Sequence, residues 1–370
     1  MPSTQSISLI TSWSEVRQQL APHWDEILER SAYPSVFQTW DYIDAWMGQA
    51  GVAFAPQVIV VEENGEPIAI APMTLGPMMV MGKPLLRQLT FLGCGGFGLS
   101  EYLDFLIPEG REQELLPAIF AELKGATGGQ WDVINFPLMR AEAASTSWLR
   151  EHLTAHMGVR LEPEDRCDSP YLPLPASWDD FMGSRSPSFR KAFKRKWNKL
   201  HREHEVKLLE VGVDCSVEDG IEHIVHLHNE RWGEESQAFS DAQFAALHRE
   251  LAPRLHAAQR LCIILLEIDG EIAAGRYDFV YRGVLWNYQS GWLPKYQKLS
   301  PGVVMLGHSL QWAMRHGLKE YDFLIGESAY KASWSSAERQ LASLQAFHPQ
   351  SLRAKAFQVV RALKRMARRG

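Results

Sequence analysis

The feature that most constrains the fold of this chain is a short pattern that occurs once in each half. The stretch VVEENGEPIA (60–69) contains two β-rich runs that meet at Asn-Gly (64–65), and LLEIDGEIAA (265–274) repeats this around Asp-Gly (269–270). Such dipeptides between apolar runs are strong hairpin signals, because tight hairpin turns need residues that tolerate a positive φ. The sequence therefore predicts a β-hairpin in each half.

The elements around the two hairpins also follow one order. Helical patterns precede each hairpin, and a strand, a helix and further strands follow it. A second match pairs YLDFLIPE (102–109) with YDFLIGE (321–327), and we interpret the two as equivalent strands. The alternative is that βαβ proteins all look somewhat alike. We expect a mixed α/β (α+β) fold of two tandem units with central mixed sheets, and 370 residues suffice for two domains.

The expected boundary between the domains is a cluster of proline and charged residues where LEPEDRCDSP meets YLPLPASW. We place an N-terminal domain at residues 1–168 and a C-terminal domain at 169–350. The C-terminal domain includes a strongly basic helical insertion at 176–204. A basic helix at 351–370 closes the chain.

Charge and cysteine content speak against several classes of protein. The formal net charge of −6 does not suit a general nucleic-acid binder, because phosphate-driven binding needs a positive field. The four cysteines lie far apart without a CxxC pair, which is typical of reduced thiols and not of disulfides or a zinc site. We find no signal-peptide pattern and no apolar run of about twenty residues. We therefore expect a cytoplasmic protein without a transmembrane segment.

A long polar loop after the second hairpin ends in Ser-Pro-Gly at the expected start of a helix. Ser300 suits the N-cap, Pro301 the first helical position, and Gly302 allows close approach of a ligand. The amides of Gly302, Val303 and Val304 would then face a phosphate or pyrophosphate, since the helix dipole adds positive charge there. The alternative is that Ser-Pro-Gly is only a favourable helix start. The loop residues that could add charge or a hydroxyl are Lys295, Tyr296 and Lys298.

Several stretches resemble the GNAT superfamily of acyltransferases, and more narrowly its double-domain branch linked to bacterial cellulose and exopolysaccharide synthesis, the CelD-like acetyltransferases. They include PSVFQTWDYIDAW, FRKAFKRKWNKL, HNERWGEESQAFSD, YQSGWLPKYQKLSPGVVMLGHSLQWAM and YDFLIGESAYKASW. The resemblance implies tandem GNAT-like domains and acetyl-CoA or another acyl-CoA as co-substrate. The usual Q/R-x-x-G-x-G/A phosphate signature is absent, and KLSPGV stands in its place.

In such a fold, the strand VLWNYQSG and the helix after Ser-Pro-Gly separate to admit acyl-CoA. The resemblance assigns Gln289 and Ser290 to donor binding, and backbone amides at 287–290 could polarise the thioester carbonyl. Tyr288 would protonate the leaving thiolate or line the acyl pocket. The alternative for Tyr288 is a buried strand residue with a structural hydrogen bond.

Acyl transfer to an amine also calls for a base. The candidates cluster in YDFLIGESAYK, where Asp322 lies on a strand and Glu327 lies just past its end. A carboxylate at the C-terminal end of a strand suits general-base work or orientation of the acceptor. We favour Glu327, because the first half lacks the GESAYK extension; in the alternative, both carboxylates only cap neighbouring elements. The residues expected to bind an anionic acceptor are Arg190, Tyr330 and Lys331.

Other motifs carry less information. The helix HIVHLHNERW places His223 and His226 on one face, but no HExxH pattern accompanies them, so we expect no metal. The absence of GxSxG and Walker motifs speaks against a serine hydrolase and a P-loop enzyme. In FRKAFKRKWNKLHREH, an aromatic stripe leaves one face basic, either as a solvated face or to meet phosphates of CoA, a lipid, a sugar nucleotide or tRNA. The tail ALKRMARRG could touch an anionic membrane surface weakly.

We therefore predict an acyltransferase that moves an acetyl or other acyl group from acyl-CoA to an amine, or as a second choice a hydroxyl, on a small or carbohydrate-linked acceptor. Two alternatives stay open. The two-domain plan with its basic insertion also resembles, more distantly, the Fem-type transferases of peptidoglycan synthesis, which use aminoacyl-tRNA. The missing glycine-rich signature would also fit a non-catalytic accessory protein of polysaccharide synthesis.

Overall fold

The chain forms two compact units. The computed structural model describes residues 4–50, 53–80, 82–95, 100–233, 236, 238–326 and 329–367. One unit comprises residues 1–167 together with 340–370, and the other comprises residues 168–339. The sequence-based division keeps residues after 339 out of the first domain, whereas in the structure they cluster with it. The reason is a strand near the end of the chain that pairs within the sheet of the first unit.

The first unit is built on a sheet with the strand order β1-β2-β3-β4-β5-β13, and β6 pairs with β13. Its elements are β1 Gln5–Ile10, α1 Trp13–Glu29, η1 Val36–Gln38, α2 Trp40–Ala50, β2 Ala55–Glu63, β3 Glu66–Val80, β4 Lys83–Phe91, α3 Glu112–Thr127, β5 Val133–Arg140, α4 Ala144–Met157, β6 Arg160–Leu161, β13 Ala337–Phe347 and α11 Leu352–Ala367. The predicted first hairpin is confirmed: β2 pairs with β3, and both turn residues, Asn64 and Gly65, have a positive φ.

The second unit has the strand order β7-β12-β11-β10-β9-β8. Its elements are β7 Asp165–Pro173, α5 Trp178–Ser184, α6 Pro187–Glu203, β8 Val206–Glu210, α7 Val217–Trp232, α8 Ala242–Ala257, β9 Leu261–Ile268, β10 Glu271–Tyr281, β11 Val284–Trp292, η4 Pro294–Leu299, α9 Pro301–Arg315, β12 Glu320–Asp322 and α10 Ala329–Trp334. The second hairpin is confirmed as well, since β9 pairs with β10 and Asp269 and Gly270 both have a positive φ.

The two sheets share one plan. In each, four strands pair antiparallel in sequence order, β1 to β4 and β8 to β11. Each then continues with a parallel neighbour, β5 beside β4 and β12 beside β11. An antiparallel strand completes each sheet, β13 on β5 and β7 on β12. These two strands are exchanged between the units along the chain. β7, which completes the second sheet, follows the elements of the first unit, and β13, which completes the first sheet, follows the elements of the second.

One part of the expected repeat is wrong. YLDFLIPE (102–109) is not a counterpart of the strand in YDFLIGE (321–327), because it precedes α3 and makes only an isolated bridge from Leu106 to Ile70. The counterpart of β12 is β5, which follows the helix α3 as β12 follows α9. Asp104 and Asp322 therefore occupy different places in the two units, and their similar sequence surroundings do not reflect a shared role.

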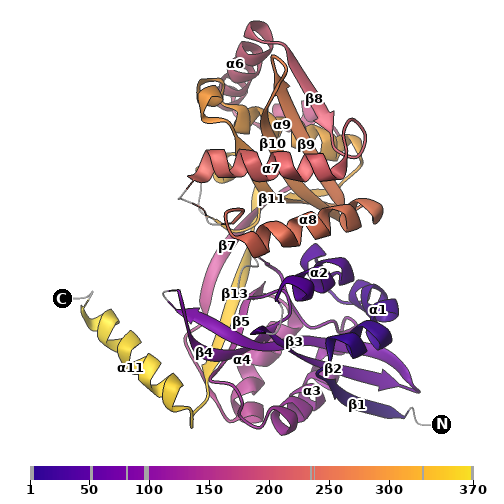
Figure 1. Cartoon of the computed structure of the whole chain (residues 1–370), viewed down its shortest axis with the longest axis vertical. Coiled ribbons are helices and arrows are strands. Elements are labelled where there is room, and N and C mark those ends of the chain that lie inside the picture. The colour runs from indigo at the N-terminus through magenta and orange to yellow at the C-terminus, as the bar shows by residue number, and fades with distance from the viewer. Residues whose placement is uncertain are drawn as a thin grey trace. The chain divides into compact units, whose positions relative to one another are not determined.

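Helices cover both faces of the second sheet. Alternate residues of a strand point to opposite faces, and on β9 the side chains of Ile264 and Leu266 join the core formed with α5, α6 and α9. Leu265 points the other way, where the space above Gly275 is filled by Ile224 and other residues of α7. Figure 1 shows α7 and α8 crossing one side of this sheet. The strands that hold the candidate site thus lie between two apolar layers.

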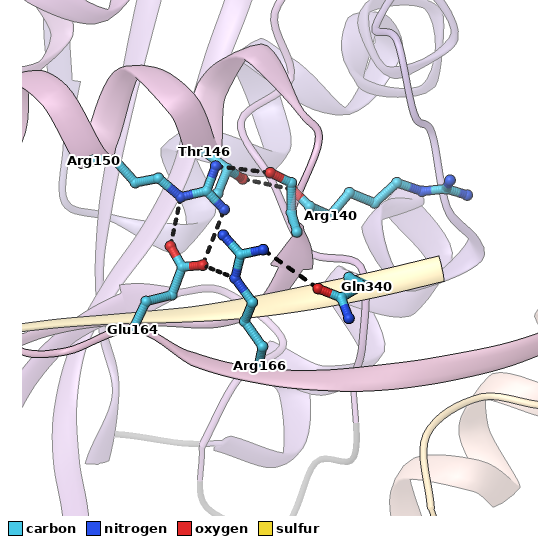
Figure 2. A network of polar contacts seen from close by, with 7 residues as sticks. Arg140, Thr146, Arg150, Glu164, Arg166 and Gln340 are labelled. Atoms are coloured by element: carbon cyan, nitrogen blue, oxygen red, sulfur yellow. Dashed lines mark hydrogen bonds and ion pairs between the residues drawn. The ribbon is translucent and has the colours of Figure 1, made fainter. Parts of the chain in front are cut away.

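A polar network anchors the last strand of the first unit (Figure 2). Glu164 accepts hydrogen bonds from Arg150 and Arg166 at 2.5 Å each, and Arg166 also donates to Gln340 on β13 at 3.3 Å. Burial alone would raise the pKa of Glu164, but the hydrogen bonds from the two arginines outweigh it and lower the pKa. The charged carboxylate therefore ties helix α4 and the segment before β7 to the strand that arrives from the end of the chain.

Candidate acyl-donor site

The short strand β12 pairs over its whole length with only the first part of β11. Their parallel pairing ends at Trp286 and Asp322. β12 stops there, whereas β11 continues to Trp292. Over residues 287–292, this edge of β11 therefore has no neighbouring strand among the described residues. A bare strand edge presents N–H and C=O groups that an extended ligand can pair with.

The same part of β11 carries a bulge at Tyr288. Tyr277 on β10 pairs with Gln289, and the next residue, Asp278, pairs with Asn287, so Tyr288 is the extra residue. The backbone amide of Tyr288 donates to the carboxylate of Asp278, which also accepts from Ser309 on α9 at 2.5 Å. Bulges re-aim neighbouring backbone groups and are common beside active sites. The buried Asp278 thus fixes the irregular backbone of the strand that lines the opening.

The side chain of Tyr288 holds the bulge from the other side. Its hydroxyl lies 3.1 Å from Nε2 of the buried His248, whose Nδ1 lies 3.1 Å from the hydroxyl of Tyr277. Burial lowers the pKa of His248 to about 3, so the ring is neutral near pH 7. The aromatic rings of Phe244 and Phe279 pack against the pair. This arrangement matches the alternative stated for Tyr288, a buried strand residue with a structural hydrogen bond. The sequence did not indicate His248 as its partner, because a single histidine in a helical pattern is no specific signal.

The loop before α9 ends as the sequence predicts, but its amides are used differently. The helix begins at Pro301 with Ser300 as N-cap, yet Ser300 has a positive φ of 56° and its side chain makes no capping bond. The amides of Val303 and Val304 both donate to the carbonyl of Ser300, at 3.1 and 3.3 Å. The N-cap carbonyl normally accepts the first bond of a helix, which is why the expected cradle of three amides is not present. Among the described residues at this start, the amide of Gly302 has no hydrogen-bond partner, whereas those of Val303 and Val304 do.

The charged and hydroxyl groups of the loop are partly engaged. Lys295 and Tyr296 both reach Glu271 at the start of β10, at 2.5 and 2.8 Å. Burial, together with this carboxylate, raises the pKa of Tyr296 to about 12. The side chain of Lys298 is exposed, and its carbonyl accepts from Lys199 of the basic helix α6 at 3.5 Å. The basic helix therefore lies against the loop, and Lys199 adds a cation that the sequence did not place there.

A tryptophan lies beneath the start of α9. A Cβ at Gly302 would come within 3.0 Å of the ring of Trp292, so glycine lets the helix start close to this ring. The guanidinium of Arg231 lies over the rings of both Trp292 and Trp232, at 4.3 and 4.4 Å. The indole of Trp232 donates to the carbonyl of Ser290 on β11 at 3.2 Å. Arg231 is thus held beside the helix start, and its buried Nε has no hydrogen-bond partner among the described residues.

Sequence reasoning missed Arg231 and Trp232, although they lie in the quoted stretch HNERWGEESQAFSD. They belong to α7, about sixty residues before the loop. Only the crossing of α7 over β11 brings them to the site. The only sequence pattern that could have pointed to them is an arginine followed by a tryptophan at the end of a helix.

Asp322 is fully engaged where β12 ends. It is completely buried, and its Oδ2 lies 2.8 Å from Arg339, which also pairs with Glu320 at 2.7 Å. Its Oδ1 accepts from the amide of Leu324 at 2.7 Å. Leu324 has a positive φ of 57°, an unfavourable conformation for a leucine that needs support from its surroundings. The carboxylate of Asp322 therefore fixes the turn that leads away from β11.

The remaining predicted residues divide into three groups. Lys331 donates to the carbonyls of Leu324 and Ile325, at 3.2 and 2.6 Å, and so stabilises the same turn. Arg190 donates to the carbonyls of Gly183 and Arg185 at the end of α5, at 3.3 and 2.9 Å. Glu327 and the side chain of Tyr330 lie outside the described residues.

The histidine-rich helix offers no obvious metal site. His228 is buried beside Phe239, and burial lowers its pKa to about 4. Among the residues that the structure describes, no three His, Cys, Asp or Glu side chains gather in a way that could hold a metal ion.

Comparison with protein families supports this view of the second unit. Residues 187–332 match the family model described as an acetyltransferase (GNAT) domain. The match runs from α6 into α10 and includes the separated strands, the bulge and the loop before α9. Over these residues the second unit is similar to GNAT acetyltransferase domains, which supports the expected class of a GNAT-type N-acyltransferase.

Solved structures extend the similarity to the fold of the whole chain. The crystal structure of FemX has a TM-score of 0.65 at 10% identity, covering 96% of this chain and 99% of that chain. A conserved protein of unknown function from Bacteroides thetaiotaomicron has a TM-score of 0.53 at 12% identity, covering 92% and 99%. A tandem GNAT protein from the clavulanic acid biosynthesis pathway has a TM-score of 0.51 at 12% identity, covering 94% and 100%.

At such low identities, the likeness establishes the fold alone. The tandem GNAT-like α/β fold expected from the sequence is confirmed at that level. No curated protein matches the sequence.

Proposed function

We propose that this protein transfers an acyl group from acyl-CoA to an amine, and that the donor binds along the free edge of β11 in the second unit. The observation that carries the proposal is the end of the β11–β12 pairing at Trp286 and Asp322, directly before the bulge at Tyr288. This opening lies within the residues that match the GNAT domain.

The groups around the opening suit the chemistry of an acyl-CoA. Bound there, the molecule supplies an activated thioester and an anionic phosphate end. The extended edge of 287–292 suits a chain with amide groups, because strand edges pair with such groups. The Gly302 amide, Arg231 and Lys298 suit the phosphates, since a helix start and nearby cations attract anions. The buried and unsatisfied Nε of Arg231 is the strongest sign that a further partner belongs here.

Positioning carries most of the catalysis in this proposal. An acceptor amine attacks the thioester carbonyl carbon, the C–S bond breaks, the amine loses a proton and the departing thiolate gains one. The rigid bulge held by Asp278 and His248 orients the donor, which is where much of the rate enhancement of such reactions originates. Asp322 acts on the turn after β12, since both of its oxygens are engaged. Glu327 remains our proposed general base.

For the acceptor, we propose an amine on a small or carbohydrate-linked molecule, in line with the resemblance to the exopolysaccharide-linked branch. Tyr330 remains a proposed contact to it. The guanidinium of Arg190 and the ammonium of Lys331 donate to backbone carbonyls. We therefore propose that these two side chains mainly hold the backbone on the side where the acceptor binds. Direct contact with an anionic group of the acceptor is a second, smaller role that we propose for them.

A second candidate is transfer of an aminoacyl group from tRNA. Two observations favour it: the fold of FemX is shared over nearly the whole chain, and the basic helix α6 lies against the loop before α9. This candidate predicts that RNA binds to α6 and that CoA has no effect.

The test is calorimetric titration of the purified protein with acetyl-CoA, CoA and a long-chain acyl-CoA. The variant Gly302→Glu places a negative charge at the start of α9 and should weaken binding roughly tenfold, since charges near a helix terminus contribute about 1–2 kcal/mol at most. Gly302→Gln is the matched control, because its side chain meets Trp292 in the same way without the charge.

Binding that is retained in Gly302→Gln and weakened in Gly302→Glu supports the phosphate site at α9. Equal affinity of the two variants for CoA would show that the phosphates do not bind at the start of α9. If no CoA compound binds the wild-type protein and aminoacyl-tRNA does, the second candidate replaces the first.

A further inference from the structure

The helix α11 at the end of the chain uses one face to pack on the first unit. Ala354 is fully buried, and Phe357 packs with it against Leu86, Val133 and Phe347. Residues 358 and 361 lie on the same side and are half-buried. This face is an ordinary amphipathic stripe at helical spacing. It anchors the helix and leaves its opposite side in solvent.

The opposite side of α11 is apolar as well. Leu352, Val359, Val360 and Leu363 are between 51% and 79% exposed. Because an α-helix turns about 100° per residue, these positions lie on the side away from Ala354. Of the eight large hydrophobic side chains exposed in the described part of the chain, four lie on this one helix face. Clustered exposed apolar residues mark a surface that meets something else.

Cations border this apolar stripe. The exposed Arg353 and Lys355 flank it. Arg353 and Leu352 also line a cavity of about 670 Å³, together with Lys124 and Arg87. The only carboxylate of its lining, in the described part of the chain, is Asp132.

Both oxygens of the Asp132 carboxylate accept hydrogen bonds inside the protein. Its carboxylate accepts from the hydroxyl of Ser351 at 2.5 Å and from the amide of Arg87 at 2.8 Å. No ion pair among the described residues joins Arg353, Lys355, Lys124 or Arg87 to Asp132 or to another carboxylate. An apolar stripe bordered by such cations complements an anionic, partly apolar surface.

We propose that α11 docks the protein on the surface of a membrane that contains anionic lipids. The stripe of Leu352, Val359, Val360 and Leu363 enters the boundary between headgroups and acyl chains. Arg353 and Lys355, with the cations of the neighbouring cavity, meet the lipid phosphates. No helix in the described residues has the length and apolarity needed to cross a bilayer, so the contact is peripheral. This proposal does not depend on the acyl transfer proposed above.

The experiment is co-sedimentation of the full-length protein with vesicles of phosphatidylcholine alone and with vesicles that also contain phosphatidylglycerol. We expect binding to the anionic vesicles, little binding to the neutral ones, and weakening by salt. Arg353→Gln combined with Lys355→Gln should reduce the partition coefficient roughly thirtyfold, as expected for removing two surface cations. Val359→Asp combined with Leu363→Asp should abolish binding.

The control is Val213→Asp, which places one of these two negative charges on an exposed valine, 76% accessible, in the second unit. Far-UV circular dichroism and the unfolding midpoint show that each variant is folded. Wild-type binding by the Val359/Leu363 variant would overturn the proposal, and so would a wild-type protein that ignores anionic vesicles. Concentration-dependent dimerisation that the same variant abolishes, without vesicle binding, would assign the stripe to a second copy of the chain instead.

Discussion

At the scale of single residues, Asp322 shows how burial decides between a catalytic and a structural carboxylate. Its place at the end of β12 suits a base, but Arg339, Ser169 and the amide of Leu324 occupy it. A general base needs an oxygen within reach of the acceptor proton. In the described residues, both oxygens of Asp322 are turned toward the protein.

This leads to a stability prediction for its partner. Arg339→Met removes the cation between Asp322 and Glu320, and should lower the free energy of unfolding by about 3–5 kcal/mol, because it strands a buried charge. Urea denaturation measures the change. Asp322→Asn should likewise lose stability while its turnover per folded molecule falls less than about tenfold, well short of the effect of losing a general base. A turnover loss of about a hundredfold at unchanged stability would restore Asp322 as the base.

His248 gives a prediction for the dependence on pH. Its pKa is about 3 in the folded protein against an ordinary value of 6.5, because burial disfavours the charged ring. Between these values the unfolded chain binds one more proton, so stability is fully present above pH 6.5 and declines as the pH falls. The decline is about 1.36 kcal/mol per pH unit for this one group.

Replacing His248 with glutamine removes its share of the slope and keeps groups that hydrogen-bond to Tyr277 and Tyr288. Unfolding free energies measured across this pH range should therefore fall less steeply in His248→Gln than in the wild type. His308, with a pKa lowered to about 3 by burial, retains its own share in both proteins. An identical slope in the two proteins would show that His248 is protonated in the folded state.

At the scale of elements, the site depends on how closely α7 crosses β11. A Cβ on Gly291 would lie 2.2 Å from the backbone carbon of Leu227 and 2.3 Å from the amide of His228. Backbone atoms cannot turn aside as side chains do. Glycine at this position therefore allows α7 to bring Arg231 and Trp232 to the opening of β11.

Gly291→Ala should push α7 away from the strand. We expect a loss of about 1–3 kcal/mol in unfolding free energy, the usual effect of overpacking, together with weaker acyl-CoA binding. Chemical denaturation and calorimetry test the two parts. Gly183→Ala in α5 is the control, since nothing lies within 4 Å of its Cβ. If Gly291→Ala were as stable as the control, the close crossing would not shape the site.

The same elements show what the sequence can predict. Both hairpins were predictable because Asn-Gly and Asp-Gly have a local conformational preference that does not depend on the rest of the fold. The start of α9 at Pro301 was predictable for the same reason. The use of its amides was not, because the left-handed conformation of Ser300 is set by the loop and has no strong sequence signature.

The parts of the site that escaped prediction depend on distant packing. Arg231 and His248 come from helices that precede the second hairpin, and their partners on β10 and β11 follow from the sheet register and its bulge. Arg339 reaches Asp322 from the first part of β13, a strand that follows β12 in the chain. Hydrophobic periodicity carries no information about such pairings.

At the scale of the whole molecule, two units share one plan, and the proposed donor site lies in the second. Each sheet has a parallel pair, β4–β5 or β11–β12, and each is completed by a strand exchanged along the chain. Tandem units were predictable from the repeated hairpins, whereas the exchanged strands were not, because strand exchange leaves no local pattern. The account assigns the acyl donor to the second unit alone.

Hydrogen–deuterium exchange of the full chain with and without CoA tests that assignment most directly. The account predicts that CoA slows exchange in peptides covering residues 287–304, the edge of β11 and the start of α9, and leaves the counterpart strand β4 unchanged. Protection confined to the first unit, or none in residues 287–304 at concentrations that saturate binding, would contradict it.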